Sequence, residues 1–188
     1  MKERLLDLIC CPSCKGELTL NQRAEREKGE IKEGRLNCSC GKDYIINNFI
    51  PRFIDSDAYV GSFSFEWHRH RKTQLDSYTN SLYSEEKFKT KTGFPVDELK
   101  NKLVLDVGCG VGRYAEIVNK YGSEVVGIDM SYAIDTAFEN MGLRGKVHFI
   151  QADIFNLPFK PGTFDYIFSI GVILINPHWY NNDAAPKG

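Results

Sequence analysis

The stretch KLVLDVGCGVGRYAEIVNKYG at residues 102–122 constrains the fold of this chain more than any other part of its 188 residues. Its apolar start predicts a buried strand, its closely spaced glycines predict a tight turn, and the spacing of Tyr114, Ile117 and Val118 predicts an amphipathic helix. The chain then continues as strand, helix, strand and strand, at residues 124–129, 131–142, 146–151 and 164–174. This alternation is typical of parallel strands with right-handed crossovers, and it predicts a doubly wound α/β sheet of about four strands.

An acidic residue stands at or just beyond the carboxyl end of each of the first three strands, at Asp106, Asp129 and Asp153. Because ligands of open parallel sheets bind outside these strand ends, we expect the three carboxylates to line one crevice. The glycine loop has the spacing G-x-G-x-G, not the G-x-G-x-x-G of dinucleotide folds, and taken alone it could equally be a plain strand-to-helix turn. Asp106 favours a ligand-binding loop over a plain turn, because a carboxylate there would repel a pyrophosphate and attract an ammonium or sulfonium group.

The other two acids fit the parts of a nucleoside. A carboxylate at Asp129 can accept two hydrogen bonds from a ribose diol. Asp153 can accept one from an exocyclic amine, while the backbone of Ile154 serves a ring nitrogen. The complementary ligand therefore carries a cation, a ribose with free hydroxyls, an amino-purine and no phosphate. S-adenosylmethionine has all four properties.

Four segments, LVLDVGCGVGRYA, VVGIDMS, IQADIFNLPF and FDYIFSIGVI, resemble the successive motifs of class I S-adenosylmethionine-dependent methyltransferases. The resemblance covers about residues 100–174 and implies a Rossmann-like sheet that binds S-adenosylmethionine. It implies that Asp106 and the loop 108–110 hold the methionine part and that Asp129 holds the ribose. Asp153 with Ile154 would hold the adenine, and the chain after the fourth strand would pass beneath the ligand. The full predicted cofactor-binding set is Asp106, Gly108, Cys109, Gly110, Asp129, Met130, Asp153, Ile154, Ser169 and Ile170. Cys109 is expected to be a small buried packing residue, and the sequence predicts no catalytic base.

Five of the six cysteines fall in the first 40 residues, and in a reducing compartment such a cluster indicates metal rather than disulfides. Cys11 and Cys14 have C-x-x-C spacing, whereas Cys38 and Cys40 are separated by one residue. Two such thiol pairs can make a tetrahedral zinc site, and a segment with so little core needs a structural metal. Free buried thiols are the alternative, and Cys10, with apolar neighbours, is expected to be packed rather than to bind metal.

The stretches CCPSCKGEL, LNCSCGKDY and YIINNFIPRFI resemble the small zinc-ribbon domains of the Trm112-like type, which are also found fused ahead of methyltransferase domains. The resemblance implies a structural zinc ion held by four thiolates, with no coordination position left for a catalytic water. The implied ligands are Cys11, Cys14, Cys38 and Cys40.

The segment SFSFEWHRHRKTQLDSY resembles the part that leads into the methyltransferase domain in this fused family, where helices cover the cofactor crevice. Its aromatic residues could line an acceptor pocket, although plain packing between the two domains is the favoured interpretation. These residues are Phe63, Phe65, Trp67 and Tyr78. His68 and His70 are expected to lie on the surface rather than to act as general bases.

The expected organisation has three parts: a zinc-ribbon domain at residues 1–55, a helical linker or cap at 56–99, and a partial cofactor-binding domain at 100–188. A complete class I methyltransferase has seven strands, and the tail NPHWYNNDAAPKG is too polar to supply the remaining ones, so we expect a truncated chain. The fourth strand would then lack a neighbour, which predicts self-association through that edge.

The net charge of −1 gives no support to a nucleic-acid or membrane-surface partner, and no segment approaches the ~20 apolar residues of a membrane span. The start of the chain is too polar for a signal peptide, so a cytoplasmic location is expected. The favoured function is methyl transfer from S-adenosylmethionine to an O, N or C nucleophile of an unidentified small molecule. A non-catalytic zinc-ribbon interaction module with a truncated cofactor domain is the alternative. An NAD-dependent oxidoreductase is disfavoured by Asp106 and by the glycine spacing.

Overall fold

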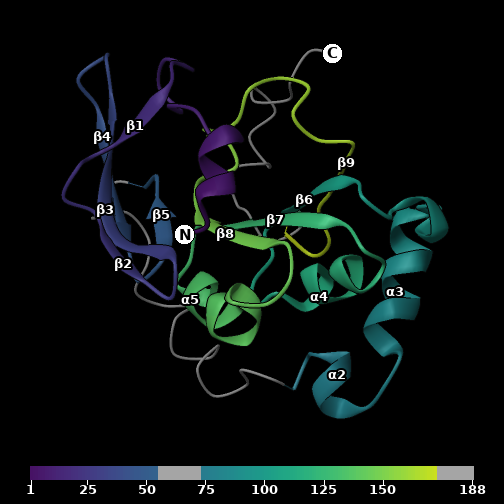
Figure 1. The fold of residues 1–188 in the computed structure, drawn as a ribbon. Coiled ribbons are helices and arrows are strands. Elements are labelled where there is room, and N and C mark those ends of the chain that lie inside the picture. The colour runs from purple at the N-terminus through teal and green to yellow at the C-terminus, as the bar shows by residue number, and fades with distance from the viewer. Residues whose placement is uncertain (55–72, 173–188) are drawn as a thin grey trace.

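A computed structural model describes residues 1–54 and 73–172 of the chain (Figure 1). Strands from both ends of the sequence join in one nine-stranded sheet, in the order β1-β3-β4-β5-β8-β7-β6-β9, with β2 paired to β3 beside this path. The first five strands are antiparallel and the pairs among β5, β8, β7, β6 and β9 are parallel. The predicted α/β sheet with parallel central strands is therefore confirmed, and the order of these strands is β8-β7-β6-β9.

The central strands match the sequence pattern closely. They are β6 (Leu103–Val107), β7 (Glu124–Asp129), β8 (Val147–Gln151) and β9 (Tyr166–Phe168). The fourth strand was predicted to be much longer than three residues, and this was wrong for the part that the structure describes. Gly171 has a φ of 85°, which takes the backbone out of the extended region soon after Phe168. Residues 173 and 174 of the prediction lie outside the described residues.

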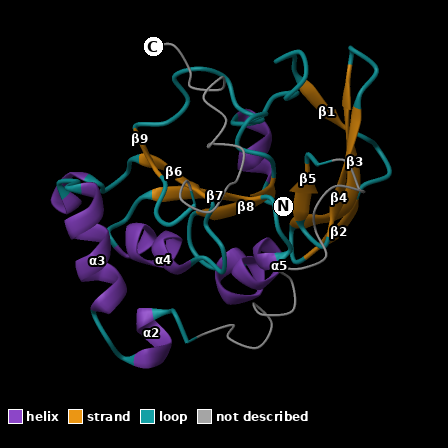
Figure 2. Ribbon diagram, turned by 180° about the vertical axis from the view of Figure 1, so that it is seen from behind, coloured by secondary structure: helices purple, strands orange, loops and turns teal. Residues whose placement is uncertain are grey.

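The helices lie mainly on one face of the central strands. They are α2 (Asp76–Thr79), α3 (Tyr83–Thr92), the 3-10 turn η2 (Val96–Glu98), α4 (Arg113–Lys120), α5 (Ala133–Ala137) and the π turn η3 (Phe138–Gly142). Figure 2 shows α4 and α5 beneath the sheet, with the N-terminal 3-10 turn η1 (Glu3–Asp7) on the opposite side. On the helical face, Phe88 of α3 packs edge-on against Phe168, with ring centroids 5.2 Å apart.

The cysteine region, residues 1–54, contributes five strands that extend the sheet, and its N-terminal turn η1 lies over the second face of the central strands. The strands are β1 (Leu18–Leu20), β2 (Glu25–Glu27), β3 (Glu30–Cys38), β4 (Asp43–Asn47) and β5 (Ile50–Arg52). Leu5 and Ile9 of this region share one buried cluster with Leu105, Ile128 and Ile150 of the central strands. The two parts of the chain therefore have a common core as well as a common sheet.

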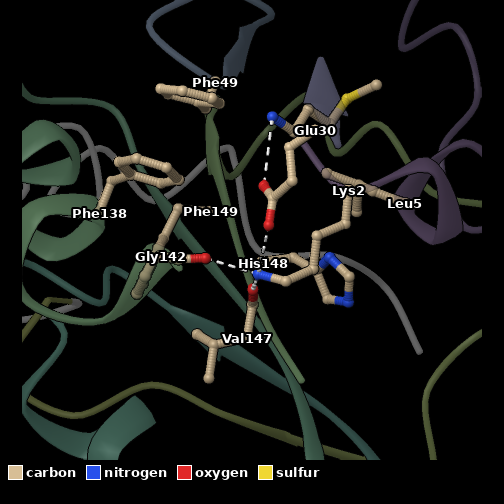
Figure 3. Close-up of a pocket in the computed structure, with 10 residues that line it drawn as sticks. Lys2, Leu5, Glu30, Phe49, Phe138, Gly142, Val147, His148 and Phe149 are labelled. Atoms are coloured by element: carbon tan, nitrogen blue, oxygen red, sulfur yellow. Dashed lines mark hydrogen bonds and ion pairs between the residues drawn. The ribbon is translucent and has the colours of Figure 1, made fainter. Parts of the chain in front are cut away.

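A second junction between the cysteine region and the central strands surrounds a small pocket (Figure 3). Lys2 Nζ donates to the carbonyl oxygens of Gly142 and Val147, at 2.5 and 2.9 Å, and so binds backbone acceptors at the end of η3 and the start of β8. Nearby, the rings of Phe49 and Phe138 stack with centroids 5.2 Å apart. Polar contacts of Lys2 and the aromatic contact of Phe49, which directly precedes β5, thus join the cysteine region to η3 and β8.

Part of the predicted linker can be compared with the structure. Between residues 73 and 99 it contains the helices α2 and α3 and the 3-10 turn η2, and its Tyr78 side chain is 64% exposed. The other candidate pocket residues, Phe63, Phe65 and Trp67, lie outside the described residues, as do His68 and His70. Within the described ranges, no helix has the length and apolar character needed to cross a bilayer.

Candidate cofactor crevice and metal centre

The glycine loop connects β6 to α4 in a conformation that side chains rarely adopt. Gly108 has a φ of 76°, and a Cβ atom at this position would lie 2.0 Å from Val172 Cγ2. The backbone N–H groups of Gly108 and Cys109 both donate to the carbonyl oxygen of Ile128, at 2.8 and 2.9 Å. The loop is therefore held against β7, and its first glycine is required both for backbone conformation and for close approach.

Asp106 lies at the end of β6 beneath this loop and is 1% exposed. The backbone N–H of Ala115 donates to its carboxyl group, but Oδ2 has no hydrogen-bond partner among the described residues. Burial, together with the charge of Asp129, raises the pKa of Asp106 to about 8. A buried carboxyl group with an unused oxygen is the kind of group that an incoming cation would stabilise in its charged form.

Asp129 ends β7 and lies close enough to Asp106 for its charge to affect that residue. Its Oδ2 accepts a hydrogen bond from the backbone N–H of Gly110 at 2.9 Å. Its Oδ1 accepts from the backbone N–H and the hydroxyl of Ser131, at 2.8 and 2.6 Å. Asp129 thus ties the glycine loop to the start of α5, a role that the sequence analysis missed, although aspartate two residues before serine is typical of such a turn.

Asp153 and Ile154 follow β8 on the same side of the sheet and are partly buried. Asp153 Oδ1 accepts from the backbone N–H of Phe155 at 3.0 Å, which makes a local turn. The backbone N–H of Ala152 donates to the carbonyl oxygen of Asp129 at 3.2 Å. This hydrogen bond places the segment after β8 beside the end of β7, so the second and third acidic positions are neighbours, as expected from a parallel sheet.

The remaining predicted residues surround the loop from other sides. Ser169 follows β9, and its hydroxyl oxygen is buried without a hydrogen-bond partner among the described residues. Ile170 packs against the buried cluster on the helical face. Cys109 is buried, and burial raises the pKa of its thiol well above the ordinary value. Met130 is partly buried next to Asp129, and its carbonyl oxygen accepts a hydrogen bond from Gln151 Nε2 at 3.0 Å.

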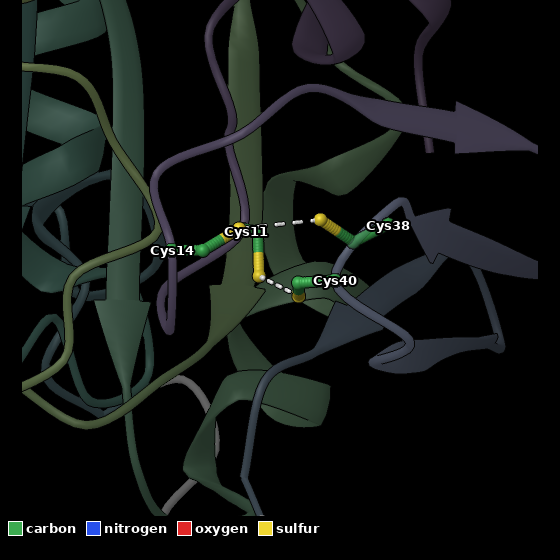
Figure 4. Close-up of side chains that lie close together, drawn as sticks. All are labelled: Cys11, Cys14, Cys38 and Cys40. Carbon is green, nitrogen blue, oxygen red and sulfur yellow. Dashed lines mark hydrogen bonds between the residues drawn. The ribbon is translucent and has the colours of Figure 1, made fainter.

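The four cysteines of the predicted metal site converge at the edge of the cysteine region (Figure 4). The sulfur atoms of Cys11 and Cys40 are 3.7 Å apart and those of Cys14 and Cys38 are 3.4 Å apart, and all four lie within 4.8 Å of one another. A tetrahedral site with Zn–S bonds of ~2.3 Å needs sulfur–sulfur distances of about 3.8 Å, so the arrangement fits zinc.

The short spacing of the second cysteine pair is accommodated by a tight turn. The backbone N–H of Gly41, with a φ of 86°, donates to the carbonyl oxygen of Cys38 at 3.0 Å, and Cys38 N–H donates to Lys42 at 2.9 Å. Tyr44 adds a contact outside the ligand set, because its hydroxyl lies 3.3 Å from Cys11 Sγ. Cys10 is buried and does not belong to the cluster, as expected.

Comparison with known families gives two matches, one over each part of the chain. The sequence matches the methyltransferase domain family over residues 104–185, a range that contains the glycine loop and all three acidic positions. This part of the chain is therefore similar to methyltransferase domains. Residues 2–48, which carry the four converging cysteines, match the Trm112p-like protein family.

The curated relatives that the chain matches differ, by their names, in what they methylate. A sterol 24-C-methyltransferase of Gibberella zeae is 28% identical over 80% of this chain and 39% of its own length. A malonyl-[acyl-carrier protein] O-methyltransferase of Legionella pneumophila is 37% identical over 42% of this chain and 27% of its own. A norajmaline N-methyltransferase of Rauvolfia serpentina is 38% identical over 39% of this chain and 27% of its own. The chain thus spans about two fifths or less of the length of these relatives.

Proposed function

We propose that the chain binds S-adenosylmethionine in the crevice at the carboxyl ends of β6, β7 and β8 and takes part in methyl transfer to a small-molecule acceptor. The observation that carries this proposal is Asp106, a buried carboxyl group at the glycine loop with an oxygen that no described residue uses. The buried hydroxyl of Ser169, which follows β9, likewise has no hydrogen-bond partner among the described residues. Buried polar atoms are nearly always paired in folded proteins, so two such atoms support a bound polar ligand.

The assignment of the ligand parts follows the chain. Asp106 and the loop 108–110 would hold the methionine end. Within that loop the side chain of Cys109 is buried in the protein. Asp129 would hold the ribose, with Met130 beside it, although hydrogen bonds to Gly110 and Ser131 already occupy part of its carboxylate. The segment that begins at Asp153 and Ile154 would hold the adenine, and Ser169 with Ile170 would lie beneath the ligand.

The bound cofactor would supply a methyl group on a positively charged sulfur. The protein's part in such a reaction is to hold the methyl group and its acceptor in line and to keep water away. The matched relatives carry names that refer to C-, O- and N-methylation, so the shared domain does not specify the acceptor atom. A small-molecule acceptor is supported by the net charge of −1, which gives no general attraction for nucleic acids.

The cysteine cluster is proposed to hold a structural zinc ion. Four sulfur ligands complete a tetrahedral site, so no position remains for a reacting water. Its free energy of binding would stabilise the sheet to which β5 belongs, because the cysteine region shares a core with the central strands.

Calorimetric titration with S-adenosylhomocysteine, the stable demethylated form of the cofactor, tests the binding proposal. We expect saturable binding of this nucleoside and no binding of NAD. Asp129→Ala should abolish binding, whereas the matched control Asp43→Ala, at an exposed position in β4, should leave the dissociation constant unchanged. Failure of the folded wild-type chain to bind, or preferential binding of NAD, would show the proposal to be wrong.

A further inference from the structure

Arg52 is the last residue of β5, and it faces the cofactor-binding domain from the cysteine region. It pairs in parallel register with Gln151, the last residue of β8, and this is the place where the strands of the two regions join. The next residue, Phe53, continues the contact by donating its backbone N–H to the carbonyl oxygen of Gln151 at 2.8 Å. Arg52 is thereby fixed at the carboxyl ends of the parallel strands, where the cofactor is proposed to bind.

The guanidinium group of Arg52 makes a two-point ion pair with Asp135. Nη2 donates to Oδ1 at 2.6 Å and Nη1 donates to Oδ2 at 3.2 Å. The two side chains are 10% and 23% exposed, so the pair is shielded from water. Asp135 stands in the first turn of α5, immediately after the loop that begins at Asp129. A planar, partly buried pair of this kind fixes orientation more firmly than an exposed salt bridge.

The same guanidinium group also controls the orientation of the Gln151 side chain. Arg52 Nη1 donates to Gln151 Oε1 at 2.8 Å. Because arginine can only donate, the amide oxygen must face Arg52, and the amide nitrogen must then point away. That nitrogen donates to the carbonyl oxygen of Met130 at 3.0 Å. Met130 follows Asp129, whose carboxylate holds the backbone N–H of Gly110.

We infer that Arg52 is a positioning residue for the nucleoside half of the cofactor. A continuous set of hydrogen bonds runs from Arg52 through Gln151 to Met130, and a second runs through Asp135 to the start of α5. The first set ends in the loop after β7, and the second ends in α5, the helix that follows this loop. That the loop holds the ribose rests on the proposed function. Asp106, which would hold the methionine end, belongs to neither set. Arg52 should therefore influence the affinity for the nucleoside and not that for the amino-acid end.

The test compares S-adenosylhomocysteine with adenosine on the full chain, by calorimetric titration. We expect Arg52→Met to raise both dissociation constants by the same factor, about tenfold, which corresponds to about 1.4 kcal/mol. Arg35→Met is the matched control, because it removes an exposed ion pair with Asp43 in the same region. It should change neither constant. Zinc content and the unfolding temperature are measured for each variant.

Gln151→Glu separates positioning from simple loss of structure. This variant keeps an acceptor for Arg52 but removes the donor to Met130 and places a negative charge beside its carbonyl oxygen. We expect the unfolding temperature to be retained while the affinities for adenosine and S-adenosylhomocysteine fall together. If the wild type binds S-adenosylhomocysteine and both variants bind within twofold of it, the inference is wrong. If the wild type does not bind, the proposed function itself fails, which is a different result.

Discussion

The pKa of Asp106 leads to a quantitative prediction about how cofactor affinity depends on pH. With a pKa of about 8, this carboxyl group is mostly protonated at pH 6 to 7 in the ligand-free protein. The α-amino group of S-adenosylhomocysteine belongs to a free amino acid, and the neighbouring carboxylate of the ligand keeps this group protonated over the same range. Before binding, both Asp106 and the ligand amine are protonated. In the ion pair only the amine keeps its titratable proton, so binding near pH 6.5 should release close to one proton from Asp106.

The magnitude follows from the fraction of each partner in its charged form. With a pKa of about 8, the ionised fraction of Asp106 increases by about ninefold from pH 6 to pH 7 and by about 50-fold from pH 6 to pH 8. The affinity should follow this rise and should fall again at higher pH, as the ligand amine loses its proton. The titratable groups that face Asp106 are Asp129, Cys109 and Tyr114. Burial raises the pKa values of Cys109 and Tyr114 above their ordinary values, so neither should titrate in this range.

Calorimetric titrations in buffers of different ionisation enthalpy measure both the affinity and the proton release. Asp106→Asn should remove the rise between pH 6 and pH 7 and the released proton. Adenosine, which has no amino-acid end, should bind the wild type with no such rise. If the affinity of the wild type for S-adenosylhomocysteine is the same at pH 6 and pH 7 and no proton is released, then Asp106 does not contact the ammonium group.

Three further predictions concern the fold and the metal. Metal analysis after dialysis should find about one zinc ion per chain, and Cys14→Ser should remove it and lower the unfolding temperature. Gly127→Ala should lower the free energy of unfolding by about 2 kcal/mol in urea, because overpacking has this magnitude and the new Cβ would lie 2.9 Å from Cys109 Sγ. Contacts with Lys120 and neighbouring side chains lower the pKa of Glu85 to about 2, so this carboxylate contributes stability above its unfolded pKa and loses it as the pH falls from about 4.5 toward 2. Acid unfolding of Glu85→Gln should accordingly lack this part of the pH dependence.

Sequence patterns predicted the local features of this chain well. The strand ending at Asp129 has the predicted bounds, and the glycine loop and the convergence of four cysteines are also as expected. These features depend on short-range rules, namely hydrophobic periodicity, glycine conformation and thiol spacing. The extent of the fourth strand was not predictable in the same way, because an apolar run such as YIFSIGVIL does not show where the backbone turns away at Gly171.

Contacts between distant parts of the chain were beyond the sequence analysis. Nothing in the composition of residues 50–54 indicates that Arg52 pairs with Gln151, 99 positions later. The second role of Asp129 was missed for the same reason, because its hydrogen bond to Gly110 joins two strand ends that only the sheet brings together. Such pairings depend on how whole helices and strands pack together, and the periodicity of a single sequence does not reveal this packing.

The shared core shows that the cysteine region is packed against the central strands rather than linked to them only through the chain. A zinc ribbon that was merely tethered would bury its apolar residues against one another. Here Leu5 and Ile9 are buried in one cluster with Ile128 and Ile150, on the face of the central strands opposite α4 and α5. Without the cysteine region, that sheet face would expose apolar side chains to water, at a cost of about 25 cal/mol per Å². Zinc bound by the cysteines would therefore stabilise the sheet that carries the crevice, and loss of the metal should weaken the cofactor site even though no cysteine of the cluster belongs to it.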